Sequence, residues 1–112
     1  MHGTGLYLKR IYNADLQKEE YAVIFSRVYN YFYPTMSDCY EPSCEALDEY
    51  QVEIIKWRKD PHTKNGKVAD HLSETIRITS INKDIANKVY WNLKHRDLTF
   101  EEVKMCVNQL SL

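Results

Sequence analysis

The chain has 112 residues, of which 44% are hydrophobic and 28% carry a formal charge. These shares are those of an ordinary globular protein, so we expect one domain over 1–112, with residues 1–5 poorly ordered, and exclude a largely disordered chain. The formal net charge of −1 is not that of a generic polyanion binder, and three glycines and three prolines are few for an all-β protein.

The charge is unevenly distributed along the chain. Residues 1–50 carry four Lys or Arg against eight Asp or Glu, whereas residues 51–112 carry eleven against eight. The basic excess is concentrated in segment 56–67, which holds five bases and one acid. Attraction between the two halves would allow head-to-tail self-association, so the sequence is compatible with a homo-oligomer.

Three cysteines, Cys39, Cys44 and Cys106, make an odd count with no signal peptide before them. This pattern is typical of a reducing compartment, so we expect a cytoplasmic, intracellular protein that is not secreted. The longest apolar stretch is far short of the ~20 residues that span a bilayer, so no membrane partner is expected.

Apolar spacing predicts a mainly α fold, a compact bundle of four to five helices. Residues 6–12 fit a short strand or the first turns of a helix equally well. A long helix is then expected from Asn13 or Asp15 to about Tyr33, where Pro34 ends it. Its buried stripe follows three- and four-residue spacings and comprises Tyr21, Ile24, Phe25, Val28 and Phe32.

A second helix is expected from Ser43, which can cap its first turn, to Lys59, before Asp60-Pro61. Its apolar face would comprise Ala46, Leu47, Tyr50, Ile54 and Trp57. Asn65-Gly66 predicts a turn, and helical spacing resumes at Val68. This spacing predicts a helix to about Ser73 or Ile76, and the alternation of β-branched residues near 75–81 indicates either a short extended segment or a strained helical end after it.

Two helix starts near the C-terminus have clear capping signals. Asn82 is expected to cap a helix that runs to about Leu93. Thr99 and Glu102 have the spacing of a capping box, which predicts a last helix from Thr99 to the end of the chain.

No motif in the chain indicates catalysis, and we expect no enzyme activity, metal or cofactor. Cys39 and Cys44 with His62 and His71 do not have the paired spacing of a zinc site. Each carboxylate pair lies near the start of a predicted helix, where the helix dipole explains it without general acid–base chemistry. These pairs are Glu19-Glu20, Asp48-Glu49 and Glu101-Glu102.

Tyrosine supplies the main functional signal, because eight of the nine tyrosines fall in the first fifty residues. One helical stripe cannot bury consecutive aromatic residues, so part of this aromatic surface should contact a partner. We therefore expect a small binding protein, an inhibitor or adaptor, whose acidic face recognises a protein with a basic surface. The expected partner-binding residues are Tyr29, Tyr31, Tyr33, Tyr40, Asp38 and Glu41.

The alternative function is that of a small nucleic-acid-binding regulator. It would use the basic segment 56–67 together with the helix after Asn82, with cations on phosphates and an indole ring on a base. The residues expected to bind nucleic acid are Lys56, Trp57, Arg58, Lys59, Lys64 and Lys67.

Overall fold

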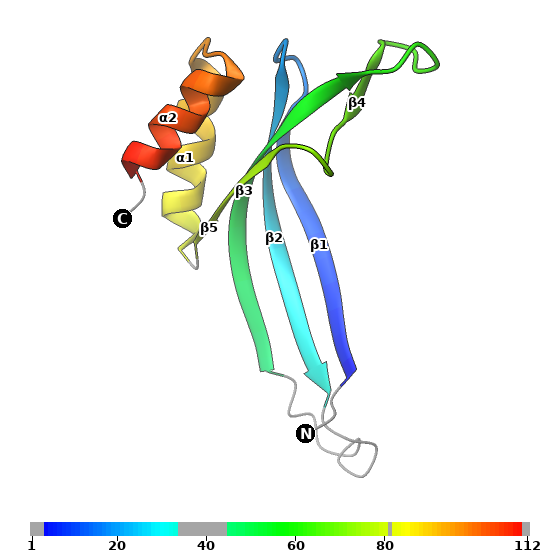
Figure 1. Ribbon diagram of the computed structural model, residues 1–112. Helices are drawn as coiled ribbons and strands as arrows, with labels where there is room; N and C mark the ends of the chain where they lie inside the picture. Colours follow the sequence, from blue (N-terminus) through cyan, green and yellow to red (C-terminus); the bar gives the residue numbers. More distant parts are fainter. Residues whose placement is uncertain (1–3, 34–44, 81, 111–112) are drawn as a thin grey trace.

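A long, curled antiparallel sheet with two helices against one face forms the fold in the computed structural model (Figure 1). The structure describes residues 4–33, 45–80 and 82–110, and for 4–7, 29–33, 45–48, 80 and 110 it describes the backbone alone. The strands are β1 (Thr4–Asp15), β2 (Tyr21–Tyr33), β3 (Glu45–Lys59), β4 (Lys67–Ala69) and β5 (Thr75–Ser80), and the helices are α1 (Lys83–His95) and α2 (Phe100–Leu110).

Strand β3 is central to the sheet, because it is paired along both of its edges. One edge pairs with β2, and the other pairs first with β5 and then with β4. Strand β1 pairs with the far edge of β2, and its register shifts between Ile11 and Asn13. This bulge at Tyr12 accompanies stacking of the Tyr12 ring on Tyr50, with ring centroids 6.2 Å apart.

The main core lies between the sheet and the helices. Alternate residues of β2 and β3 contribute to it, as expected for the side of a strand that faces a packed layer. Its buried members are Tyr21, Val23, Phe25, Val52, Ile54, Ala86, Tyr90, Leu93, Phe100 and Val103.

The helices cover only part of the sheet's length. A strand of 15 residues such as β3 is about 50 Å long, whereas a helix of 13 residues such as α1 is about 20 Å long. Figure 1 shows β1, β2 and β3 continuing well beyond the two helices. The ends of these strands therefore present a sheet face over which neither helix lies.

The prediction of a mainly α bundle of four to five helices is wrong. Strands make up 44% of the chain, and the two long segments expected to be helical are β2 and β3. Both faces of these central strands carry buried residues, among them Val23 and Phe25 on one face and Ala22 and Val28 on the other. The resulting apolar run hides the two-residue period of a strand and also contains helical spacings.

The C-terminal helices follow the capping signals. Asn82 accepts hydrogen bonds from the backbone N–H groups of Asp84 and Ile85 at the start of α1. Before α2, the Thr99 N–H donates to Glu102 Oε1 at 3.2 Å, and the Glu102 N–H donates to Thr99 Oγ1 at 3.2 Å. The extended alternatives for 6–12 and for the described part of 75–81 agree with the structure, which has β1 and β5 (Thr75–Ser80) there, whereas the helix expected from Val68 is wrong, because β4 occupies Lys67–Ala69.

Candidate functional site

The strand assignment changes how the predicted tyrosines are arranged. Tyr29, Tyr31 and Tyr33 occupy alternate positions of β2, and alternate residues of a strand belong to the same face. They lie an even number of residues from Val23 and Phe25, so their positions are on the same face of β2 as these two members of the main core. We call Tyr29, Tyr31 and Tyr33 the tyrosine row. The row continues the helix-covered side of the sheet beyond the helices.

The register gives the tyrosine row neighbours on both sides. Tyr29 pairs with Leu8 on β1 and with Asp48 on β3. The Leu8 side chain is 50% exposed. On the same face, one step closer to the helices, Arg27 of β2 pairs with Tyr50 of β3. The Arg27 guanidinium lies 5.6 Å from the centre of the Tyr50 ring. The other predicted partner-binding residues, Asp38, Tyr40 and Glu41, lie outside the described residues.

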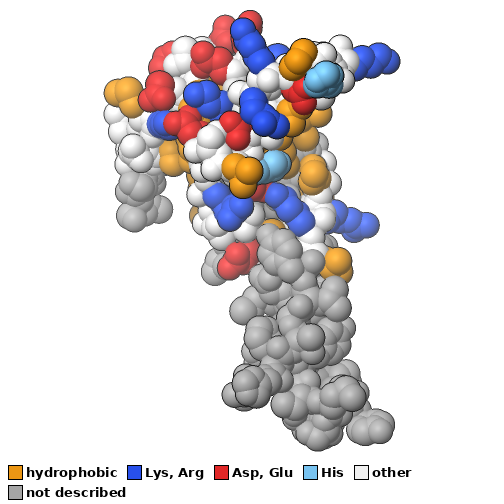
Figure 2. Space-filling model, turned by 45° about the vertical axis from the view of Figure 1, so that its right-hand side comes forward, with side chains coloured by type: hydrophobic (Ala, Val, Ile, Leu, Met, Phe, Trp, Pro, Cys, Tyr) orange, Lys and Arg blue, Asp and Glu red, His pale blue; other side chains and the backbone are white. Residues whose placement is uncertain are grey.

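The basic segment forms a hairpin and not the end of a helix. Trp57–Lys59 of β3 pairs with Lys67–Ala69 of β4, and residues 60–66 connect them. We call residues 57–69 the arm. Figure 1 shows the arm extending from the sheet on the side away from the helices. In Figure 2, Asp and Glu side chains gather at the upper left of the described part, and Lys and Arg side chains occupy its centre and right-hand edge.

Hydrogen bonds fix the tip of the arm. The Asp60 carboxylate accepts from the His62 N–H at 2.9 Å, and the Asp60 backbone N–H donates to the Gly66 carbonyl at 3.0 Å. The Asp60 carbonyl accepts from the Thr63 hydroxyl at 3.0 Å. Gly66 has a φ of +69°, a left-handed conformation that glycine adopts without strain.

The base of the arm is held by the connection between β1 and β2. The Lys18 carbonyl accepts from the Trp57 indole N–H at 2.9 Å and from Lys67 Nζ at 3.3 Å. The Trp57 backbone N–H donates to the Glu20 carbonyl at 2.8 Å. Because the indole edge is fixed in this way, Trp57 supports the arm.

An open hollow of about 710 Å³ lies between the arm and the start of α2. Trp57, Lys59 and Lys67 line it on the arm side, and Glu19 and Glu101 line it near α2. Acidic and basic side chains both line the hollow, so its charge does not select a strongly anionic ligand.

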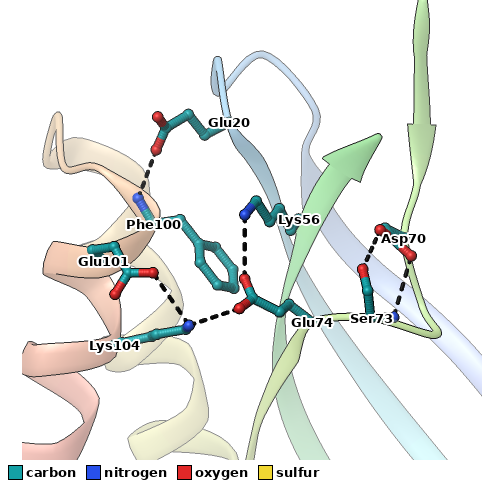
Figure 3. Close-up of polar contacts among 8 residues, drawn as sticks. All are labelled: Glu20, Lys56, Asp70, Ser73, Glu74, Phe100, Glu101 and Lys104. Atoms are coloured by element: carbon teal, nitrogen blue, oxygen red, sulfur yellow. Dashed lines mark hydrogen bonds and ion pairs between the residues drawn. The ribbon is translucent and has the colours of Figure 1, made fainter. Parts of the chain in front are cut away.

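Lys56 differs from the other predicted nucleic-acid-binding residues because its ammonium group forms an ion pair. Lys56 Nζ lies 3.4 Å from Glu74 Oε2 and 5.7 Å from the centre of the Phe100 ring (Figure 3). Lys104 Nζ donates to the same carboxylate at 2.9 Å, and this hydrogen bond lowers the pKa of Glu74 from its usual value. The Glu20 side chain accepts from the Phe100 N–H at 2.9 Å. Together these contacts fix α2 on the sheet.

The sheet face away from the helices contains a buried carboxylate that the sequence analysis missed. Glu53 of β3 is 1% exposed and forms ion pairs with Lys9 of β1 and with Arg77 of β5, the latter at 3.4 Å. Burial is the main reason that the pKa of Lys9 is lowered. Ser26 and Gln51 pair beside it and are also buried. The alternation of Gln51 and Glu53 with Val52 and Ile54 was the available signal.

The described residues contain no group of three or more His, Cys, Asp or Glu side chains arranged to hold a metal ion. His62 and His71 are exposed, and Cys39 and Cys44 lie outside the described residues. Cys106 on α2 is a partly buried free thiol. Among the same residues, no helix is long and apolar enough to cross a membrane.

Comparisons of the chain with protein-family models, with curated proteins and with solved structures found no match.

Proposed function

We propose that this protein acts by binding another protein, with the tyrosine row at the centre of the interface. The observation that carries the proposal is the register of β2, which brings three tyrosines onto one face of a sheet beyond its helical cover. Tyrosine suits this role, because its ring contributes a large contact area with little loss of conformational freedom and its hydroxyl can form a hydrogen bond.

Asp48 beside the tyrosine row supports a partner with a basic surface, and the pair of Arg10 and Arg27 limits this acidic region on the side toward the helices. Leu8 extends the aromatic row with exposed apolar area, and Asp48 pairs with Tyr29 at its other side. Segment 1–50 also has twice as many acidic as basic residues. Complementary charge around an aromatic centre increases the rate of association and favours the correct partner.

The test compares a variant of the tyrosine row with a matched aromatic control. A partner is captured from source-cell lysate, identified and purified, and its affinity for each variant is then titrated. The double variant Tyr31→Ala/Tyr33→Ala should bind at least about thirtyfold more weakly, since removal of a central anchor costs about 2 kcal/mol or more. Trp91→Ala removes a part-exposed ring from α1 and should leave the affinity unchanged.

Circular dichroism and thermal unfolding establish that both variants are folded. A folded Tyr31→Ala/Tyr33→Ala variant with the affinity of the wild type would contradict the proposal. Loss of binding on Arg58→Gln/Lys59→Gln alone would instead assign the interface to the arm.

A further inference from the structure

The cations of the arm form no ion pairs within the described part of the chain, and Arg58 interacts with Asp70 only at longer range. Arg58, Lys59 and Lys64 are exposed. None of the ion pairs among the described residues involves these three side chains or Lys67. Lys56 and Lys104, by contrast, both pair with Glu74. The positive charge of the arm is therefore left for the solvent or for a ligand.

The carboxylates of the two acids in this region accept hydrogen bonds within turns. The Asp60 carboxylate accepts from the His62 N–H at the tip. Asp70, just after β4, accepts from the backbone N–H and the hydroxyl of Ser73 (Figure 3). Hydrogen bonding by Ser73 is the main reason that the pKa of Asp70 is lowered, and the charge of Arg58 lowers it further.

The register also places two lysines directly opposite each other. Lys59 of β3 pairs with Lys67 of β4, and like charges at directly opposed positions destabilise a sheet. Lys67 Nζ donates to the Lys18 carbonyl, whereas the Lys59 side chain is exposed. A polyanion that lies across the pair would remove this repulsion.

The shape of the arm favours duplex over single-stranded nucleic acid. The arm is a two-stranded ribbon with a hydrogen-bonded tip, and the major groove of B-DNA accepts such a ribbon. Binding of single strands depends on aromatic rings that stack on bases. Segment 60–66 has no Phe, Tyr or Trp, and the Trp57 indole N–H is bonded to the Lys18 carbonyl.

We propose that the arm is a second binding site, which contacts the phosphate backbone of duplex DNA through Arg58, Lys59 and Lys64. Arg58 and Lys59 line the hollow together with its glutamates, and Lys64 lies in the tip, so the DNA approaches from the tip and lies along the strands of the arm. This site is separate from the tyrosine row, and either proposal can fail without the other.

The experiment measures the affinity of the full chain for a fluorescent 30-bp duplex (about three turns of B-DNA) by anisotropy at increasing salt. If three phosphates are neutralised, the logarithm of the association constant should fall with the logarithm of the salt concentration with a slope of about −2.7. Binding at 200 mM salt should then be about fortyfold weaker than at 50 mM. The variant Lys59→Gln/Lys64→Gln should bind weakly at low salt and lose only about fourfold over that range.

The matched control is Lys83→Gln/Lys88→Gln, which removes the same charge from exposed positions of α1. It should retain the affinity and the salt slope of the wild type. A single-stranded oligonucleotide of the same length and anionic phosphatidylserine vesicles should both bind more weakly than the duplex. Tyr31→Ala/Tyr33→Ala should leave duplex binding unchanged, which separates this site from the proposed protein interface.

Several results would overturn the proposal. They are the absence of duplex binding at 50 mM salt, a salt slope that Lys59→Gln/Lys64→Gln does not change, an equal loss in the α1 control, and stronger binding to the single strand or the vesicles. Circular dichroism of each variant establishes that any loss of binding does not come from unfolding.

Discussion

Lys56 and Lys59 lie three positions apart on β3, yet their ammonium groups have different surroundings. Lys56 contacts Glu74 and the ring of Phe100, so it stabilises the packing of α2. Lys59 is exposed and lies opposite Lys67. The sequence groups both lysines in one basic segment, because the acid that neutralises Lys56 is distant along the chain. Only the fold separates structural cations from those that a ligand can reach.

The buried Glu53 should make the protein sensitive to loss of its cations. Lys9→Met leaves a buried carboxylate with Arg77 alone, which is 56% exposed, and we expect a loss of about 2–3 kcal/mol in the free energy of unfolding. This is slightly below the usual range for a broken buried pair, because one partner remains. Urea unfolding at neutral pH measures the change.

The double variant Lys9→Met/Glu53→Met serves as the control for that prediction. It removes the buried charge together with its partner and should recover most of the lost stability. If Lys9→Met unfolds at the same urea concentration as the wild type, Arg77 alone is enough to compensate Glu53.

The contact between Glu74 and Lys104 predicts a pH dependence with a defined sign. The pKa of Glu74 is lowered by the Lys104 hydrogen bond, so its contribution is complete above the unfolded value of 4.5 and is lost as the pH falls through the folded value. The pKa of Lys104 is raised, mainly by Glu74, so its contribution is complete below 10.5 and is lost as the pH rises through the folded value.

Glu74→Gln should therefore lower the urea midpoint at neutral pH, and this difference should shrink as the pH falls below 4.5. Glu101→Gln is the matched control. Glu101 also contacts Lys104, but its side chain is 76% exposed, so we expect a smaller effect. Equal midpoint differences at neutral and acidic pH would show that the Glu74 charge does not stabilise the fold.

Local signals were enough to predict the C-terminal helices but not the central strands. Asn82 and the Thr99–Glu102 capping box satisfy backbone groups within three residues, so the sequence alone indicates both helix starts. The pairing partners of β2 lie on β1 and β3, and no short window contains them. The richness of β2 in Tyr, Val, Ile and Phe was a strand signal that helical spacing concealed.

For the candidate sites, too, the sequence indicated the residues but not their arrangement. The sequence identified the tyrosines and the cations as residue types, but it predicted both groups on helices. The alternation of Tyr29, Tyr31 and Tyr33, which would spread them around a helix, brings them onto one face of a strand. The basic segment became a hairpin because Lys67–Ala69 pairs back onto β3.

The capping box gives a prediction at the scale of a helix. Thr99→Ala removes the acceptor for the Glu102 N–H and should lower the free energy of unfolding by about 1 kcal/mol. Thr99→Ser keeps the hydroxyl and should stay close to the wild type in urea unfolding. A Thr99→Ala variant as stable as Thr99→Ser would indicate that the hydroxyl contributes little to α2.

At the scale of the whole molecule, the length of β3 separates two surfaces of opposite composition. Its first residues include Glu45, Asp48 and Glu49, near the tyrosine row, and its last ones include Arg58 and Lys59 of the arm. Because this strand is about 50 Å long, its two ends lie far apart.

The acids at the start of β3 and the bases at its end contribute an electric dipole along this strand. In the field of a polyanion such a dipole experiences a torque, which turns the arm toward the source of the field and the acidic end away from it. Molecules that approach DNA would then arrive in one preferred orientation, with the tyrosine row facing the solvent. A protein with a basic surface would be attracted to that outward end, so the order of the two binding events would be set by orientation before either contact forms.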